Sequence, residues 1–389
     1  MTSPYADRLA DIQPFHVMAL LARARELEAQ GRDIVHMEIG EPDFVTPAPI
    51  LAAAQQALRD GRTHYTPALG LPELRAAIAR HYQTSYGLEI SPQRIIVTPG
   101  GSGALLLVLG ALVNPGDEVL MSDPGYPCNR HFVRFVEGRP VAVPVDAATG
   151  YQLNAELLAQ HWTPRSVAAL LASPSNPTGT LITAEALADL IAYVQARNGA
   201  VIVDEIYHGL VYEGAQSSAL SLSDDVFVIN SFSKYFNMTG WRLGWIVAPH
   251  AYVSALDKLA QNLFLAAPTL AQYAALAAFA PETLAILEQR RREFQRRRDY
   301  LVPALQELGF DISSVPQGAF YIYAGCARFT HDSYAFATGL LETVGVAITP
   351  GIDFGAHQPH THVRFAYTTS MERLREGVER LRNAIRIAP

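Results

Sequence analysis

Seven short apolar runs recur through the middle of the chain, and most are followed by a loop and a helical pattern. Runs of this kind, with no polar alternation, are typical of strands that a parallel sheet buries on both faces. They lie at Arg94–Thr98, Glu118–Met121, Val141–Val145, Val167–Ala172, Ala200–Asp204, Val226–Asn230 and Leu243–Ala248. The alternation of strand and helix predicts an α/β fold, with a mostly parallel seven-stranded sheet that helices cover on both faces.

The last of these strands is connected differently from the others. Only residues 231–242 separate it from the sixth strand, and this stretch is too short and too broken for a helical crossover. We therefore predict that Leu243–Ala248 runs antiparallel to its predecessor. The start of this strand would then lie at the edge of the sheet where the other strands end.

Apolar residues at helical spacing predict helices on both sides of this region. They lie at Phe15–Gln30, Pro49–Arg59, Pro72–Tyr86, Ala104–Val113, Ala251–Leu265, Leu270–Ala280, Pro281–Gln306, Ser333–Val344 and after Ser370. Short strands are predicted at Ile34–Ile39 and Val363–Ala366, and Gly318–Tyr323 looks like part of a hairpin. We expect residues 46–280 to form a large domain, and residues 281–389 to form a smaller α+β domain with the N-terminal segment 1–45.

Composition and charge narrow the class of protein. Hydrophobic residues make up 49% of the chain and charged residues only 17%, which indicates extensive burial, including a subunit interface. The formal net charge of −7 argues against nucleic-acid binding. Two arginine clusters, at 290–292 and 296–298, lie on a helical pattern and are interpreted as a solvated helix face.

We expect neither a membrane-spanning segment nor a metal-binding site. No stretch approaches the 18 apolar residues of a membrane span, and the first residues contain no apolar signal region. Cys128 and Cys326 are too few for a disulfide framework, which favours a cytoplasmic protein. His357, His360 and His362 lie close together, but they have neither helical i, i+4 spacing nor a supporting thiolate for zinc.

The loop after the sixth strand contains the first candidate for chemistry. The chain has only two lysines, Lys234 and Lys258, among 30 basic residues, and Lys234 lies between small and hydroxyl residues. Arginine stays charged, whereas a desolvated lysine can lose its proton and condense with an aldehyde to a Schiff base. A solvated loop lysine is the alternative, so the neighbouring residues decide between the two.

Other distinctive residues follow the ends of the predicted strands, where ligands bind in open α/β sheets. They are Gly101, Ser102, Gly103, Tyr126, Asn176, Asp204, Tyr207, Ser231 and Ser233, with Arg242 at the start of the reversed strand. Helix-opening amides, hydroxyls and a guanidinium suit a phosphate, and a buried carboxylate would keep a pyridine nitrogen protonated. For Asp204 a helix N-cap or a salt bridge is the alternative.

Several motifs in chain order resemble those of class I/II aminotransferases, the fold-type I enzymes that use pyridoxal 5′-phosphate. The resemblance runs from about the first helix to the last. Its motifs are Gly40–Phe44, Tyr65–Gly70, Thr98–Gly101, Asp123–Pro127, Ser173–Gly179, Asp204–Tyr207, Ser231–Lys234 with Gly240–Arg242, and Arg364.

The resemblance implies a role for each site residue. Lys234 would carry pyridoxal phosphate and shuttle the proton, Asp204 would pair with the pyridine nitrogen, and Tyr207 would contact O3′. Asn176 would also contact O3′, and Tyr126 would stack on the ring. The phosphate would be held by Gly101, Ser102, Gly103, Ser231, Ser233 and Arg242, and by Tyr65 from the other subunit of a homodimer. The substrate α-carboxylate would be held by Arg364, Asn176 and the backbone of Gly40.

The reaction implied is ping-pong transfer of an amino group from an L-amino acid to a 2-oxo acid such as 2-oxoglutarate or pyruvate. A carbon–sulfur lyase or other eliminating enzyme would share the same lysine, and a pyridoxal-phosphate-binding regulator is a further alternative. Some relatives with acidic substrates carry a basic residue where Ser102 stands. Its absence, with apolar stretches at Ile12–Phe15 and Leu263–Ala267, favours neutral or aromatic donors.

Overall fold

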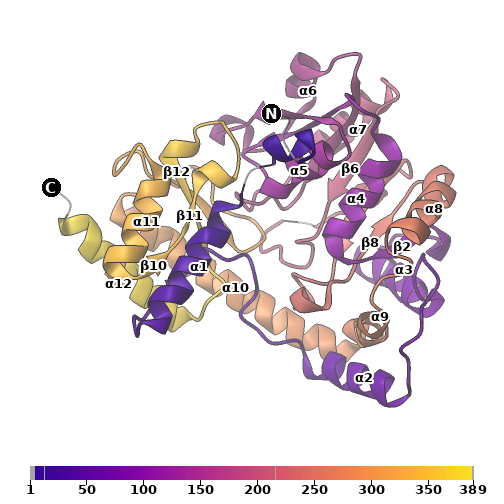
Figure 1. Ribbon diagram of the computed structural model, residues 1–389, viewed down its shortest axis with the longest axis horizontal. Helices are drawn as coiled ribbons and strands as arrows, with labels where there is room; N and C mark the ends of the chain where they lie inside the picture. The colour runs from indigo at the N-terminus through magenta and orange to yellow at the C-terminus, as the bar shows by residue number, and fades with distance from the viewer. Residues whose placement is uncertain (1–4, 13, 215, 388–389) are drawn as a thin grey trace.

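The computed structural model describes residues 5–12, 14–214 and 216–387, and its largest element is the expected seven-stranded sheet (Figure 1). The strands are β2 (Ile95–Thr98), β3 (Glu118–Asp123), β4 (Arg139–Pro144), β5 (Ser166–Ala172), β6 (Ala200–Asp204), β7 (Val226–Ser231) and β8 (Gly244–Val247), in the order β2-β8-β7-β6-β5-β3-β4. The strands at the centre of the sheet are buried along nearly their whole length, which explains why they appear as continuous apolar runs.

Strand β8 runs antiparallel to both of its neighbours, and the other pairs are parallel. The predicted reversal is therefore confirmed. In the β7–β8 pair Ser231 lies opposite Gly244, so the end of β7 and the start of β8 share one edge of the sheet. Residues 231–242 leave and re-enter the sheet at that edge.

Helices cover both faces of this sheet. On one face pack α4 (Gly100–Leu112), α5 (Pro127–Phe135) and α8 (Val253–Leu263). On the other face pack α3 (Pro72–Tyr86), α6 (Ala155–His161), α7 (Ala184–Gln195) and α9 (Thr269–Leu276). Helix α2 (Ala48–Arg59) packs against α9. The sheet is thus the middle layer of three, and a ligand can reach polar groups at the carboxyl ends of its strands, which the helices do not cover.

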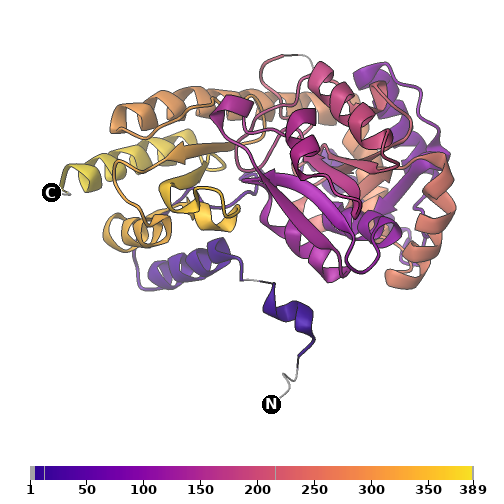
Figure 2. The same ribbon diagram turned by 90° about the horizontal axis from the view of Figure 1, so that it is seen from above.

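A second core lies beside the first, built from the two ends of the chain (Figure 2). It holds the antiparallel sheet β11 (Thr349–Pro350), β12 (His362–Ala366) and β9 (Tyr321–Gly325), and the parallel pair β1 (Val35–His36) and β10 (Val346–Ala347). Its helices are α1 (His16–Ala29), α10 (Pro281–Leu308), α11 (Ser333–Val344) and α12 (Met371–Ile387). The division into domains at residues 45 and 280 stays a proposal.

The remaining short elements are 3-10 helices. They lie at Asp7–Ala10, Pro92–Arg94, Ala147–Thr149, Ala219–Ser221, Thr239–Trp241, His250–Tyr252, Ala277–Phe279, Gly351–Asp353 and Pro359–Thr361. Two sequence predictions in the second core are wrong in detail. The strand predicted at Ile34–Ile39 is only two residues long, because β10 offers it a partner of the same length. The stretch Gly318–Tyr323 is no hairpin, since β9 pairs with β12, which comes much later in the chain.

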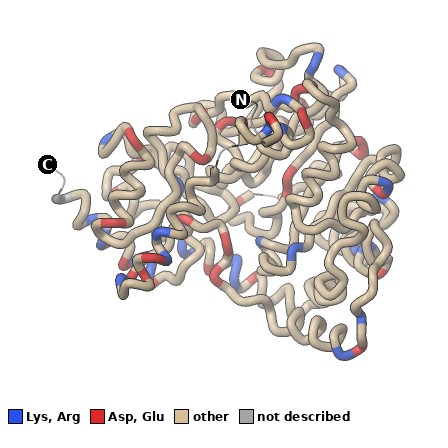
Figure 3. The backbone as a smooth tube through the Cα atoms, in the orientation of Figure 1, with Lys and Arg blue, Asp and Glu red and all other residues tan. Residues whose placement is uncertain are grey.

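The arginine clusters of α10 form the predicted solvated face only in part, since Arg292 and Arg296 are exposed but Arg297 and Arg298 are buried. Arg297 and Arg298 are each only 3% exposed, because α10 packs between the two cores. Arg297 pairs with Asp43 at 2.8 Å and Arg298 with Glu213 at 2.7 Å. Buried charges require partners of this kind, and these come from distant parts of the chain. Elsewhere acidic and basic residues are interspersed along the chain (Figure 3).

Among the described residues, no single helix has the length and apolar character needed to cross a membrane. The segments Thr269–Phe279 and Pro281–Leu308 reach this length and apolar character only when they are taken together, and the chain bends by 83° between them.

Candidate active site

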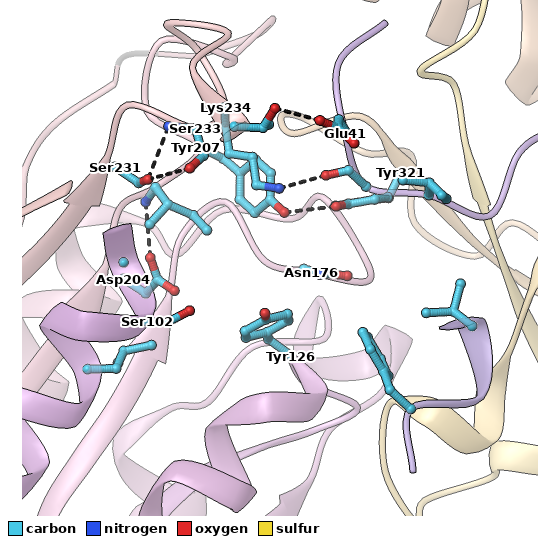
Figure 4. A pocket seen from close by; sticks show the side chains of 18 of the residues that line it. Glu41, Ser102, Tyr126, Asn176, Asp204, Tyr207, Ser231, Ser233, Lys234 and Tyr321 are labelled. Atoms are coloured by element: carbon cyan, nitrogen blue, oxygen red, sulfur yellow. Dashed lines mark hydrogen bonds between the residues drawn. The ribbon is translucent and has the colours of Figure 1, made fainter. Parts of the chain in front are cut away.

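A cavity of about 430 Å³ opens at the carboxyl edge of the large sheet, next to the second core. Residues from both cores line it, as Figure 4 shows in part. The cavity brings together the predicted residues Gly40, Gly101, Ser102, Tyr126, Asn176, Asp204, Tyr207, Ser231, Ser233, Lys234, Arg242 and Arg364. Gly103 and Tyr65 are the two predicted residues that do not line it.

The reversed strand explains how Arg242 reaches this cavity. Arg242 directly precedes the β7–β8 edge and adopts a left-handed backbone conformation, with φ of 53°. Its Nη1 donates to the backbone oxygen of Thr239 at 2.9 Å and to Ser233 Oγ at 3.3 Å. A Cβ added at Gly100 would lie 2.5 Å from Arg242 Nη2, so only glycine leaves room for this guanidinium.

The start of α4 offers hydrogen-bond donors to an anion at the same place. No side chain caps this 13-residue helix, whose first residues are Gly100, Gly101 and Ser102. Unpaired amides and the positive end of the helix dipole favour a phosphate there. The hydroxyls of Ser231 and Ser233 are 3.0 Å apart and complete the cradle with Arg242. Gly103 lies within the same helical turn, where an added Cβ would contact the Pro99 ring at 3.0 Å.

Lys234 lines the cavity and is half-buried. Its Nζ donates to the backbone oxygen of Gly40 at 2.6 Å, an interaction drawn in Figure 4. Burial of the amine and the nearby Arg364 lower the pKa of Lys234 to about 8. About a tenth of the amine is therefore neutral, and nucleophilic, at pH 7, far more than for an ordinary lysine. The alternative of a solvated loop lysine is wrong.

Asp204 lies at the end of β6 and is 5% exposed. Its Oδ1 accepts one hydrogen bond, from the backbone N–H of Ile206 at 3.1 Å. Burial raises the pKa of Asp204 to about 7, although this N–H and Lys234 act in the opposite direction. Among the described residues no ion pair neutralises this carboxylate, so a cationic group in the cavity would find an unpaired partner.

The stability of the protein without ligand should depend on pH through Asp204. Its folded pKa of about 7 lies above the ordinary value of 3.8, so the folded state holds a proton that the unfolded state has lost between these values. The free energy of unfolding should therefore fall as pH rises from 4 to 7, by about 1.4 kcal/mol per pKa unit. Asp204→Asn should remove this contribution. Urea unfolding at pH 5 and pH 7.5 measures it, and an equal fall in both proteins would contradict it.

Tyr126 and Asn176 lie across the cavity from Tyr207 (Figure 4). The hydroxyl of Tyr207 is 2.9 Å from that of Tyr321, which comes from β9 of the second core. Sequence reasoning missed Tyr321, although its position in a buried aromatic run after Gly318 was a usable signal. It also missed Glu38, Ile39, Glu41, Leu105, Ile206, Thr239 and Gly240, which line the cavity.

Arg364 faces the cavity from β12 and is 3% exposed. Its Nη1 donates to Asn176 Oδ1 at 2.9 Å, and its Nη2 donates to the backbone oxygen of Glu38 at 2.6 Å. The Nε is buried and has no hydrogen-bond partner. The guanidinium also lies 4.2 Å above the ring of Tyr321. A fixed guanidinium with a free donor is well suited to a carboxylate.

The two apolar stretches predicted at the mouth have different positions. Phe15 lines the cavity together with Val17 and Met18, while Gln13 lies outside the described residues. The stretch Leu263–Ala267 does not line it. Its last two residues border a separate hollow beside Tyr65, whose side chain is 82% exposed.

The histidine cluster does not form a metal site in the part of the chain that the structure describes. No group of three His, Cys, Asp or Glu side chains there could hold a metal ion. The ring of His362 instead stacks on Tyr323, with ring centroids 4.8 Å apart.

Comparison with known proteins agrees with this geometry. The family described as aminotransferase class I and II matches residues 32–381. A valine–pyruvate aminotransferase of Mycobacterium tuberculosis is 40% identical over 96% of each chain, and an aspartate/prephenate aminotransferase of Thermus thermophilus is 36% identical over 96% of each chain. The crystal structure of an aminotransferase from Mycobacterium tuberculosis has a TM-score of 0.95 and 38% identity, covering 99% of this chain and 100% of the other.

The fold and the cavity, with its buried lysine, carboxylate and arginine, are those of a group-transfer enzyme. The chain belongs to the class I and II aminotransferases. It is a transaminase, and its substrates are amino acids and 2-oxo acids. Enzymes of this family generally depend on pyridoxal phosphate.

Proposed function

We propose that the cavity binds pyridoxal 5′-phosphate on Lys234 and transfers amino groups between an L-amino acid and a 2-oxo acid. The observation that carries this proposal is that three groups meet in one cavity: a half-buried amine with a lowered pKa, a buried carboxylate without a counter-charge, and an uncapped helix start. An aldehyde, a pyridine nitrogen and a phosphate are their respective chemical partners.

The cofactor, when bound, supplies an electron sink that stabilises negative charge on the substrate α-carbon. Asp204 keeps the ring nitrogen protonated, and Tyr126 stacks on the ring. Asn176 and Tyr207 hydrogen-bond the ring hydroxyl. Tyr321 orients Tyr207 through the hydrogen bond between their hydroxyls.

The phosphate is held by Gly101, Ser102 and Gly103 at the start of α4, and by Ser231, Ser233 and Arg242. The room that Gly100 leaves beside Arg242 supports this assignment. Arg364, helped by Asn176 and the backbone of Gly40, holds the substrate α-carboxylate. The amine of Lys234 would be the base that moves the proton to and from the substrate α-carbon.

We also propose a homodimer in which each subunit contributes Tyr65 to the phosphate site of its partner. Tyr65 is 82% exposed and lies outside the cavity of its own chain. Leu263 and Leu265, which closely precede the hollow-lining Ala266 in the chain, are 60% and 56% exposed, and exposed large apolar side chains favour an interface. The free thiols of Cys128 and Cys326 support a location in the reducing cytoplasm.

The reaction is tested by adding single amino acids to the cofactor-loaded protein and recording the absorbance of the cofactor. Conversion to the amine form, with release of the matching 2-oxo acid, is expected. Reversal by a 2-oxo acid completes the ping-pong cycle. Release of pyruvate together with ammonia or a thiol, without conversion, would instead identify an eliminating enzyme.

Replacing Arg364 by lysine should weaken substrate binding more than it affects cofactor binding. Lysine keeps the charge but cannot make the bidentate contact with a carboxylate, so KM for the amino acid should rise about 10- to 100-fold. The absorbance of the bound cofactor should stay unchanged. Arg292→Lys, at an exposed position of α10, is the matched control. Equal KM values for the two variants would show that Arg364 does not bind the substrate carboxylate.

A further inference from the structure

The cationic side chains of the cavity all have partners under the proposed function. Among the described residues of its lining, these side chains are Lys234, Arg242 and Arg364. Lys234 is assigned to the cofactor aldehyde, Arg242 to the phosphate and Arg364 to the α-carboxylate. This lining therefore offers no further cation to a second carboxylate at the far end of a substrate side chain.

The acidic residues of the lining also disfavour a second carboxylate on the substrate. Glu41 is exposed at the cavity, where its Oε1 accepts a hydrogen bond from Thr239 Oγ1 at 2.5 Å. Figure 4 shows Glu41 on the same side of the cavity as Lys234. A substrate carboxylate that lost its water here would have no counter-charge and would meet a like charge, and both effects disfavour it.

One wall of the cavity is apolar instead. Phe15, Val17 and Met18, at the start of α1, line the cavity, and Ile39 and Leu105 are further apolar residues of its lining. Val17 is 5% exposed, but Met18 is 55% exposed, which leaves apolar surface available at the cavity. Covering that surface with an apolar side chain is favourable, because both surfaces lose contact with water.

The start of α1 is held in place by Asp353. One carboxylate oxygen accepts the N–H of His16 at 2.8 Å, and the other accepts the N–H of Val17 at 2.8 Å. The negative charge of Asp353 also lies at the positive end of the α1 dipole. Asp353 thus anchors the start of α1, and with it the apolar wall, at the cavity.

We infer that the amino-group donor is an L-amino acid with an uncharged, apolar side chain, of the aliphatic, thioether or aromatic kind. That side chain packs against Phe15, Val17 and Met18. Acidic amino acids are poor donors because the cavity lining of one chain offers their second carboxylate no cation. This inference rests on the proposed function, since it uses the roles of Lys234, Arg242 and Arg364.

Rates of the first half-reaction test the inference directly. The cofactor-loaded protein is mixed with L-leucine, L-methionine, L-phenylalanine or L-aspartate, and the second-order rate constant is taken from the absorbance change. The best apolar donor should exceed aspartate by about 100-fold or more, as expected when a site leaves a charged group unpaired. Aspartate as the best donor would overturn the inference.

A charge placed in the apolar wall should change this preference. Met18→Arg adds a cation at an exposed position, so it should raise the constant for aspartate and shift the leucine-to-aspartate ratio at least about tenfold. Met18→Gln, of similar length but uncharged, removes apolar surface without adding a cation, so it should lower the constant for leucine without raising the constant for aspartate. Equal shifts in the two variants would contradict the role of the wall.

The same data separate this inference from the proposed function. Conversion of the cofactor by aspartate alone would overturn the donor class and leave the transfer chemistry standing. If no amino acid converted the cofactor to its amine form, both the proposed function and the inferred donor class would be wrong.

Discussion

Replacing Lys234 by alanine will abolish transamination, lowering kcat about 10⁴-fold or more. Lys234 supplies the only amine side chain among the described residues that line the cavity, and alanine can neither hold the cofactor nor move a proton. The fold should survive, because the side chain makes a single hydrogen bond, to Gly40, and its buried charge is unfavourable.

Steady-state kinetics and thermal unfolding of the same preparation check this prediction. Lys258→Ala is the matched control, since Lys258 is the only other lysine of the chain and lies exposed on α8. The control should keep normal activity. Activity of Lys234→Ala within tenfold of the unmodified enzyme would rule out Lys234 as the catalytic amine.

The second large effect is expected at Asp204. Asp204→Asn keeps the shape of the side chain, and its Oδ1 can still accept the N–H of Ile206, but the negative charge is lost. Without that charge the ring nitrogen is no longer held protonated, so kcat should fall about 10²- to 10³-fold, as when a positioned electrostatic partner is removed.

The neighbouring residue offers a stringent control for Asp204. Glu205 is also buried, but its carboxylate bonds to Ser218 and to the N–H of Ala219 and does not line the cavity. Burial raises the pKa of Glu205 to about 8. Glu205→Gln should change stability and leave kcat within a few-fold. A larger loss of kcat in Glu205→Gln than in Asp204→Asn would contradict the assignment.

Much of the large sheet could be predicted from the sequence, because its strands are buried on both faces and appear as unbroken apolar runs. The reversal of β8 followed from the shortness of residues 231–242 alone. The strand order could not be predicted in this way. It depends on which strands pair across long stretches of chain, and local apolar patterns carry no information on that.

The cavity was predicted in part for a similar physical reason. Residues at the carboxyl ends of parallel strands share one edge, so Asp204, Asn176 and Tyr126 could be grouped from topology. Tyr321 and Met18 come from the second core, and their approach depends on how the two cores pack. The buried pair of Arg297 with Asp43 was missed because a charged helix pattern indicates a surface when its distant partner is unknown.

The covalent site of the cofactor is the most direct test of the account. The enzyme loaded with pyridoxal phosphate is reduced with borohydride, which makes the bond to the amine permanent, and its peptides are analysed by mass spectrometry. With two lysines in the chain, the result is unambiguous. The account predicts the pyridoxyl group on the peptide that contains Lys234. A pyridoxyl group on Lys258, or on neither lysine, would contradict it.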